Sequence, residues 1–399
     1  MILIHTADWH LGQTFFGYDR TKEHSNFLAW LTATIKEKKA DALLIAGDIF
    51  DTPNPSASAQ KSLYKFIRDV TQENPQLRII ITAGNHDSGA RLEAPDTLME
   101  TMGVTVRGTI QRTADASFDY ERHIIALSAD ICCVALPYLR QGDYPAAESY
   151  SEGVRHTFSA LMEKARERYK QIILMGHLFA TGGNVSSDDR SERTVVGGLD
   201  SVELGPLSSE ATYIALGHLH KAQSLGPKKN ICYSGAPLPM SFAERCNRQS
   251  VTMLTIDNDG LTTEKLEIPG CVKLLSIGVA PLTQVIKEIE NLPVGEADDQ
   301  SPYLEIKIEI SEPEPTLRAQ IEKALEGKAV RLTRIEAVAQ QGTSSIEAPL
   351  TYDEVKSIDP LRLAIDFFSR SYGHEEMPEN MQKLLREVIT EISNEDFSN

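Results

Sequence analysis

Short, nearly continuous apolar runs alternate with longer amphipathic segments through the first 270 residues. The runs are typical of buried strands, and the segments between them, with apolar residues three and four positions apart, predict helices. Strands that alternate with helices favour a layered α/β domain. The predicted strands are Met1–Thr6, Ala42–Ala46, Arg78–Thr82, Ile131–Leu136, Ile172–Met175, Thr212–Leu216 and Ile231–Ser234. The predicted helices are Thr21–Lys38, Ser56–Val70 and Val154–Tyr169.

A second region runs from residue 271 to 339, where the pattern changes to strand, helix, strand, helix, strand and predicts a small α+β domain. Residues 340–358 are polar and lack strong periodicity, so we expect a linker there. Residues 181–198 of the first domain hold four glycines among Ser and Asp residues, which predicts a long surface loop. The elements expected in the second region are Val272–Val279, Leu282–Glu290, Tyr303–Ile310, Pro315–Leu325 and Ala329–Ala337.

Residues 359–399 carry two short amphipathic patterns. Asp359 can cap a helix that has Pro360 at its first position, and Gly373 supplies a stop. The periodicity predicts a helical hairpin but leaves open whether it packs on its own chain or docks on another. Its apolar faces are Leu361, Ala364, Ile365 and Phe368, then Met381, Leu384, Leu385, Val388 and Ile392.

Composition narrows the class of protein. With 41% hydrophobic and 24% charged residues, the chain is of the ordinary globular kind. No apolar run approaches the ~20 residues that cross a bilayer, and the N-terminus has no signal-peptide pattern. The five cysteines form no CxxC pair, so we expect reduced thiols in a cytoplasmic protein.

The net charge of −17 argues against a protein that simply coats DNA, because non-specific affinity comes from Lys and Arg on phosphates. Residues 271–399, however, hold 24 acidic and 13 basic side chains, so most of the excess lies outside the first domain. Charge therefore neither supports nor excludes a nucleic-acid substrate.

Five polar motifs each follow directly on a predicted strand. Sites in open α/β sheets assemble at the carboxyl ends of strands, and the glycines in these motifs permit sharp turns. Each motif alone is ordinary turn chemistry, but the five together predict one site. They are Asp8-Trp9-His10-Leu11-Gly12, Gly47-Asp48-Ile49-Phe50-Asp51, Gly84-Asn85-His86-Asp87, Gly176-His177 and Gly217-His218-Leu219-His220.

The residue types in these motifs indicate a metal site. Five of the ten histidines lie there, beside Asp and Asn residues. Imidazole and carboxylate together suit Mn, Fe or Zn, whereas Mg prefers oxygen ligands alone. The set contains no cysteine, which argues against a closed structural zinc site.

At these residues the chain resembles the calcineurin-like metallophosphoesterases, and among them the branch of double-strand-break repair nucleases. The resemblance covers essentially the whole chain and implies a layered β-sandwich flanked by helices for residues 1–270. It also implies a DNA-capping domain at 271–339, a linker at 340–358 and an ATPase-docking helical hairpin at 359–399. Its specific features are Asp8–Gly12, Gly17-Tyr18-Asp19-Arg20, Gly47–Asp51 with Pro53-Asn54-Pro55-Ser56, and Gly217–His220.

The resemblance assigns the site residue by residue. His86 would lie just outside the metals, stabilise the transition state and protonate the leaving oxygen, with Asp51 as its orienting partner. Many relatives have His where this chain has Asp51. For Asp87 a turn-stabilising role stays open. One metal would be held by Asp8, His10, Asp48 and His220, and the other by Asp48, Asn85, His177 and His218.

The resemblance further implies two Mn²⁺ per chain, with Mg²⁺ as a substitute, and hydrolysis of DNA at double-strand ends and hairpins. The activity would be 3'-5' exonuclease and endonuclease, in DNA repair, recombination and replication. The implied partners are an ABC-type coiled-coil ATPase, through which alone ATP would act, and a second copy of the chain, giving a heterotetramer. No membrane partner is expected, and the location would be cytoplasmic and nucleoid-associated.

Three other functions share parts of these motifs. Ser/Thr phosphatases have Arg-Gly after the second motif, where this chain has Thr52-Pro53, so that alternative is weak. A nucleotide or small-molecule metallophosphodiesterase would have the same metals but no need of the terminal hairpin. A scaffold with a vestigial site is disfavoured because the ligand motifs are complete.

Overall fold

The structure, a computed structural model, divides into two compact units, Met1–Ala339 and Gln340–Asn399. Most of the expected 181–198 loop and the whole 340–358 linker lie outside the residues that it describes. Those residues are 1–114, 117–184, 201–257, 260–310, 316–339, 361, 364, 365, 368, 377–379 and 381–386.

The first of two six-stranded sheets has the order β14-β13-β1-β4-β5-β6. Its strands β1, β4, β5 and β6 run parallel, and β13 and β14 add an antiparallel hairpin beside β1. The bounds are β1 (Ile2–Thr6), β4 (Ala42–Ala46), β5 (Arg78–Thr82), β6 (Val104–Arg107), β13 (Ser250–Asp257) and β14 (Gly260–Glu267).

The second sheet has the order β11-β12-β10-β9-β8-β7. Its four central strands are parallel, and antiparallel strands close both edges. The bounds are β7 (Ile124–Ala126), β8 (Ile131–Ala135), β9 (Gln171–His177), β10 (Tyr213–Gly217), β11 (Gln223–Leu225) and β12 (Ile231–Tyr233).

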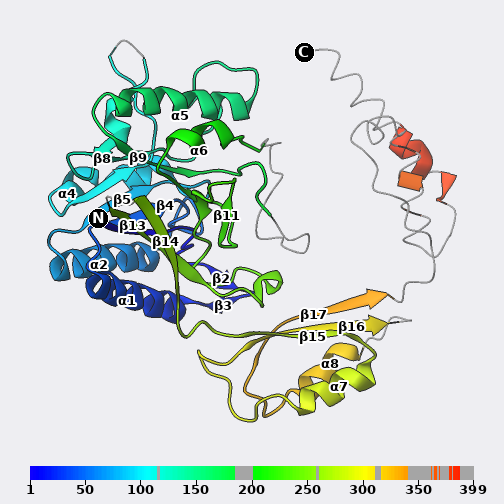
Figure 1. Cartoon of the computed structure of the whole chain (residues 1–399). Coiled ribbons are helices and arrows are strands. Elements are labelled where there is room, and N and C mark those ends of the chain that lie inside the picture. Colours follow the sequence, from blue (N-terminus) through cyan, green and yellow to red (C-terminus); the bar gives the residue numbers. More distant parts are fainter. Residues whose placement is uncertain are drawn as a thin grey trace. The chain divides into compact units, whose positions relative to one another are not determined.

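The two sheets pack face to face, and helices cover their outer faces, so that the domain has four layers (Figure 1). In β4, Leu43 and Ile45 pack toward the helices and Leu44 packs toward the second sheet. A strand buried on both faces needs apolar residues throughout. The covering helices are α1 (Thr21–Lys38) and α2 (Ala57–Glu73) on the first sheet, and α5 (Tyr150–Arg166) and α6 (Gly205–Glu210) on the second.

Shorter elements connect these layers. None of the helices in the described part of the chain is long and apolar enough to cross a membrane. The connecting elements are β2 (Thr14–Phe15), β3 (Tyr18–Asp19), α3 (Gly89–Glu93), α4 (Asp96–Glu100), and the 3₁₀ turns η1 (Glu121–His123) and η2 (Phe242–Glu244).

Strands β13 and β14 were not predicted from the sequence. β14 is the edge strand of its sheet, and most of its residues face solvent. Thr262, Thr263, Glu264 and Lys265 therefore stand where a buried strand would have apolar residues. Without an apolar run, the strand had no signal of the kind that marks β4 or β5.

A three-stranded parallel sheet follows, in the order β15-β16-β17. It has a hydrophobic core of its own, in which Val285 and Ile321 from the two helices meet Ile306 from the central strand. The bounds are β15 (Leu274–Ala280), α7 (Leu282–Glu290), β16 (Tyr303–Ile310), α8 (Leu317–Ala324) and β17 (Arg331–Ala339). Within the second unit, residues 361, 364, 365, 368 and 381–386 are helical.

A buried polar network joins β16 to α1. Arg20 and Glu23 form an ion pair that is almost wholly buried, with 3.0 Å between Nη2 and Oε2. The Tyr303 hydroxyl donates to Glu23 Oε1 over 2.7 Å, and Arg20 also donates to the Pro239 carbonyl at 2.8 Å and to Gln13 Oε1 at 2.8 Å. Arg20 and Glu23 therefore join three segments that are distant in the sequence, namely residues 13–23, Pro239 and Tyr303.

We predict that Arg20→Met lowers the free energy of unfolding by ~3–5 kcal/mol, because Glu23 would be left buried without its partner. Adding Glu23→Gln should recover part of that loss by removing the stranded charge. Urea denaturation followed by circular dichroism measures both variants. An Arg20→Met protein within ~0.5 kcal/mol of the wild type would contradict the importance of this pair.

Candidate metal centre

The five motifs meet at one edge of the sandwich. Three of them follow β1, β4 and β5, which are parallel neighbours in the first sheet, and two lie at the ends of β9 and β10, which are parallel neighbours in the second. Parallel neighbours end on the same side, and the stacked sheets bring their two rows of ends together. Residues as distant as Asp8 and His218 thereby contact each other.

Trp9 fixes the turn after β1. Its ring is fully buried against Phe27 and Phe66, and its Nε1 donates to Thr6 Oγ1 at 2.9 Å. With Trp9 pointing into the layer of α1 and α2, the side chains on either side of it, Asp8 and His10, lie in the site. Their φ angles are +54° and +45°, a region that costs a non-glycine residue ~1–3 kcal/mol and is concentrated at functional sites.

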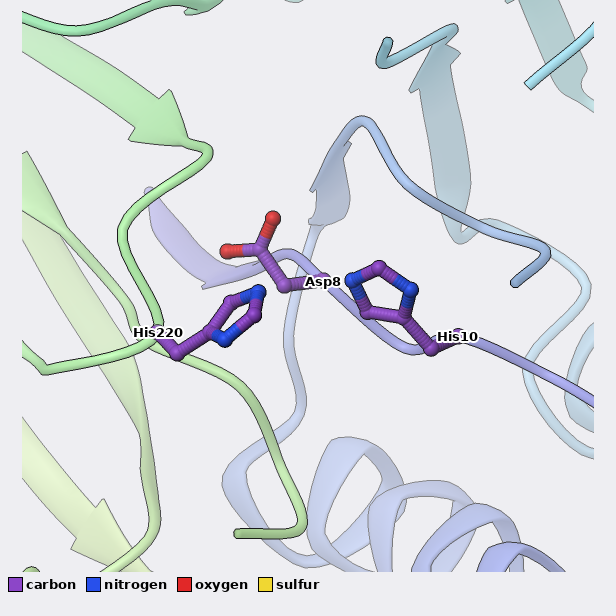
Figure 2. A group of neighbouring side chains, drawn as sticks. All are labelled: Asp8, His10 and His220. Carbon is purple, nitrogen blue, oxygen red and sulfur yellow. The ribbon is translucent and has the colours of Figure 1, made fainter. Parts of the chain in front are cut away.

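Asp8, His10 and His220 form the first group of possible ligands, with one ligand atom from each within 4.8 Å of the others. Figure 2 shows the Asp8 carboxylate between the two imidazole rings. All three side chains are buried, yet Asp8 Oδ2 and His10 Nε2 have no hydrogen-bond partner. Unsatisfied buried polar atoms are costly. A cation held at this point would satisfy both, so these residues fit a metal.

A second group that could hold a metal is Asp8, Asp48 and His177. Asn85 contacts His177, and its Oδ1 also lies 3.1 Å from His218 Nδ1, so these side chains adjoin the group. His177 Nδ1 lies 2.9 Å from the Ala46 carbonyl and therefore carries its hydrogen there. Its Nε2 is 2.9 Å from Asn85 Oδ1 and 3.3 Å from Asp48 Oδ2. An unprotonated Nε2 would present a lone pair to two oxygens, an arrangement that a cation between them stabilises.

Asp48 lies close to histidines of both groups. Its Oδ2 is 3.3 Å from His177 Nε2 and 3.7 Å from His10 Nε2, while Oδ1 accepts a hydrogen bond from the His86 backbone at 2.8 Å. A Cβ atom at position 84 would overlap this carboxylate, so only glycine fits there. One oxygen of Asp48 thus faces both His10 and His177.

The pKa values reflect the crowding of buried charges. Burial raises the pKa of Asp8 to about 6, an effect that His177 opposes and Asp48 reinforces. Burial lowers the pKa of His177, but the Asp48 and Asp8 carboxylates outweigh it and raise that pKa to about 9. Burial and the neighbouring His177 lower the pKa of His218 to about 3, which keeps its imidazole neutral and able to bind a metal.

The expected contact between His86 and the Asp51 carboxylate is replaced by another. His86 Nδ1 lies 2.9 Å from the backbone carbonyl of Asp51, whereas the Asp51 carboxylate lies 3.3 Å from His10 Nδ1. The turn after Asp48 directs the carbonyl toward His86 and the side chain toward His10. Asp51 therefore contacts His86 through its main chain and orients a ligand with its side chain.

Two further acidic residues, Asp87 and Glu244, contact the motifs of the site without belonging to the two groups. Asp87 accepts hydrogen bonds from the backbone N–H groups of Ile49, Phe50 and Gly84, at 2.9–3.1 Å, which ties the second motif to the third. Glu244 was not found from the sequence; its Oε1 is 3.9 Å from His220 Nδ1. It lies in η2, far along the chain from His220 and outside every motif, so that only the fold reveals the contact.

Two family models match the chain. Residues 1–222 match the calcineurin-like phosphoesterases, so the expected fold is confirmed. Residues 271–372 match a family described as the type 5 capsule protein repressor C-terminal domain, SbcD_C.

Curated relatives narrow the assignment. The SbcD component of nuclease SbcCD from Rhodobacter capsulatus is 34% identical over 369 residues, which cover 88% of this chain and 90% of the relative. The protein of the same name from Escherichia coli K12 is 28% identical over 407 residues, covering 98% and 97%. That of Bacillus subtilis 168 is 30% identical over 265 residues, covering 64% and 66%. The chain belongs to the calcineurin-like phosphoesterases and, within them, to the SbcD family of nucleases, as the resemblance implied.

We predict that the affinity for Mn²⁺ rises with pH between about 6 and 9. As ligands, Asp8 must be ionised and His177 neutral. With metal-free pKa values of about 6 and about 9, His177 must lose a proton across this range as the metal enters, and Asp8 must do so only near its lower end. Calorimetry at pH 7 in buffers of different ionisation enthalpy should show proton release. An affinity independent of pH in this range would show that these two groups are not ligands.

Proposed function

We propose that this chain is the metal-dependent nuclease component of an SbcCD-type complex and hydrolyses phosphodiester bonds of DNA with two metal ions. The observation that carries the proposal is the position of Asp48, whose Oδ2 faces ligands of both groups. The relatives, which are named as parts of a nuclease, supply the class of substrate.

We assign the ligands as the resemblance implied. Asp8, His10 and His220 would hold one cation, and Asn85, His177 and His218 the other, with Asp48 bridging. A mixture of imidazole and carboxylate suits Mn²⁺ better than Mg²⁺, which we expect to be a weaker substitute. When bound, two divalent cations lower the pKa of water and offset the charge of the phosphate.

His86 is placed to act on the leaving oxygen. It is half-buried, and its ring packs edge-on against His10 with 4.8 Å between centroids. Because Nδ1 is held by the Asp51 carbonyl, Nε2 is the atom that can hold and donate a proton. As phosphorus gains the new bond from water, Nε2 would protonate the oxygen that departs.

The partner proposal concerns residues 359–399. In the described part of this segment, helical Met381 and Leu384 are 44% and 63% exposed. Apolar side chains on a helix need a cover, and the curated relatives are named as one component of a complex. We propose that this segment docks on a coiled-coil ABC-type ATPase, that ATP acts through that partner, and that residues 271–339 cap the DNA. The chain would also dimerise, giving a heterotetramer in the cytoplasm.

We predict that two substitutions separate metal binding from the rate of cleavage. Asp48→Ala should lose both metals and all cleavage of end-labelled duplex DNA, because the bridging carboxylate is gone. His86→Gln should keep two metals and slow cleavage by ~10²–10⁴, the range for a positioned acid or base. Asp130→Ala, which removes an exposed carboxylate on the turn before β8, is the matched control.

Metal content by calorimetry and single-turnover cleavage in Mn²⁺ measure these effects. An Asp48→Ala protein that binds two metals and cuts DNA would refute the assignment of Asp48 as a bridging ligand. Wild-type protein that hydrolyses a small phosphodiester but no DNA would instead indicate a small-molecule phosphodiesterase.

Deletion of residues 341–399 should leave metal binding intact but abolish co-purification with the ATPase and ATP-dependent cleavage of hairpin ends. The first unit contains its own sheets and cores, so it should fold without the second. If the truncated chain still bound the ATPase with full affinity, docking through this segment would be refuted. A markedly lower melting temperature of the truncated chain would mean that residues 341–399 complete the chain's own core.

A further inference from the structure

The hairpin of β2 and β3 follows directly on the first metal motif and carries an aromatic residue at its tip. Phe15 and Tyr18 anchor it, because Phe15 is buried and the Tyr18 hydroxyl donates to the Leu332 carbonyl at 2.9 Å. Phe16, between them, is 45% exposed. Its φ of +50° is strongly disfavoured for a bulky side chain. The anchored hairpin thus holds an aromatic ring at the surface.

The surroundings of Phe16 are aromatic and include the guanidinium of Arg334, which is ion-paired with Glu305 and Glu336. Its ring centroid is 5.0 Å from that of Phe15 and 5.8 Å from that of Phe242, and the Arg334 guanidinium is 5.6 Å from it. Nearby, the Arg331 guanidinium stacks on Tyr303 at 3.7 Å, but both side chains are buried, so Phe16 and Arg334 are the members of this group that reach the surface. Aromatic rings with guanidinium groups are the surface on which proteins stack unpaired bases.

Two observations limit the distance between this surface and the candidate metal centre. Phe16 is six residues after His10, so the chain limits their separation to about 20 Å, and the hydrogen bond from Gln13 N–H to the His10 carbonyl, at 3.0 Å, shortens it further. Phe242, which contacts Phe16, also shares the short turn η2 with Glu244, beside the ligand His220. Since a DNA strand has one phosphate per ~3.4 Å, Phe16 lies within about six nucleotides of the bond cut.

We propose that the exposed face of Phe16, with Arg334 beside it, stacks an unpaired nucleobase of the DNA substrate. Paired bases inside a duplex offer no free face, whereas the bases of a hairpin loop or a frayed end do. The surface would thus favour substrates with unpaired bases near the scissile phosphate. This inference rests on the proposed nuclease function and names the part of the DNA that the site selects.

The test uses the full-length protein together with the co-purified ATPase partner and ATP, in Mn²⁺, and a DNA hairpin that has 2-aminopurine in its loop. Cleavage of this hairpin is compared with hydrolysis of bis(p-nitrophenyl) phosphate, which has no base and reports on the metal centre alone. Binding is followed separately with a hairpin whose phosphorothioate linkages resist cleavage. The quenching of its 2-aminopurine fluorescence reports stacking of the base. The variants are Phe16→Ala, Phe16→Leu and Phe16→Trp, with Tyr64→Ala, a residue of α2 that is 41% exposed, as the matched control.

For Phe16→Ala and Phe16→Leu we expect the ratio of hairpin to small-ester kcat/KM to fall about tenfold or more, with loss of quenching. Phe16→Trp should retain both, and Tyr64→Ala should match the wild type. An unchanged ratio for Phe16→Ala, full function in Phe16→Leu, or no quenching in the wild type would each overturn stacking. If the wild type hydrolyses the small ester but does not cut DNA, the nuclease function is refuted. The fluorescence quenching would still show whether Phe16 stacks on a base.

Discussion

The arrangement of this molecule depends on bringing two buried carboxylates and four histidines to one edge of the sandwich. Asp8 and Asp48 are almost fully buried, and the raised pKa of Asp8 records the cost. Such a cluster is unfavourable unless cations or protons compensate it. The sandwich tolerates the cost because strand ends from two packed sheets fix the ligands before any cation binds. Cations held here would therefore stabilise this edge of the domain as well as supply its chemistry.

Backbone strain has the same origin. Asp8, His10, Asp48 and His218 all have positive φ, and all belong to the ligand set proposed above. Strained residues persist only where the surroundings over-determine them. Trp9 in the helical layer and the three backbone hydrogen bonds to Asp87 supply that constraint. Residues without a catalytic role thus set the geometry of the site.

The sequence predicted those features that depend on a single strand and the turn after it. β4 and β5 have the bounds that their apolar runs predicted, and the motifs that follow them meet as the rule for strand ends requires. Contacts between turns that are distant in the chain leave no pattern in the sequence. The direction of the Asp51 carboxylate depends on the turn after Asp48, and the approach of Glu244 to His220 depends on a loop after β12. Edge strand β14 was missed because its residues face solvent.

The distribution of charge limits how such a site can hold DNA. Residues 1–270 carry 33 acidic and 27 basic side chains, and two divalent cations would reduce that deficit to about −2. The proposed metals would then belong to the substrate-binding surface, because this part of the chain has no net positive charge to replace them. Affinity for a polyanion normally comes from phosphate contacts. Where those are scarce, contacts without net charge, such as stacking on an aromatic ring, must account for a larger share of binding. An acidic nuclease of this kind is therefore expected to select DNA by exposed bases more than by its phosphate backbone.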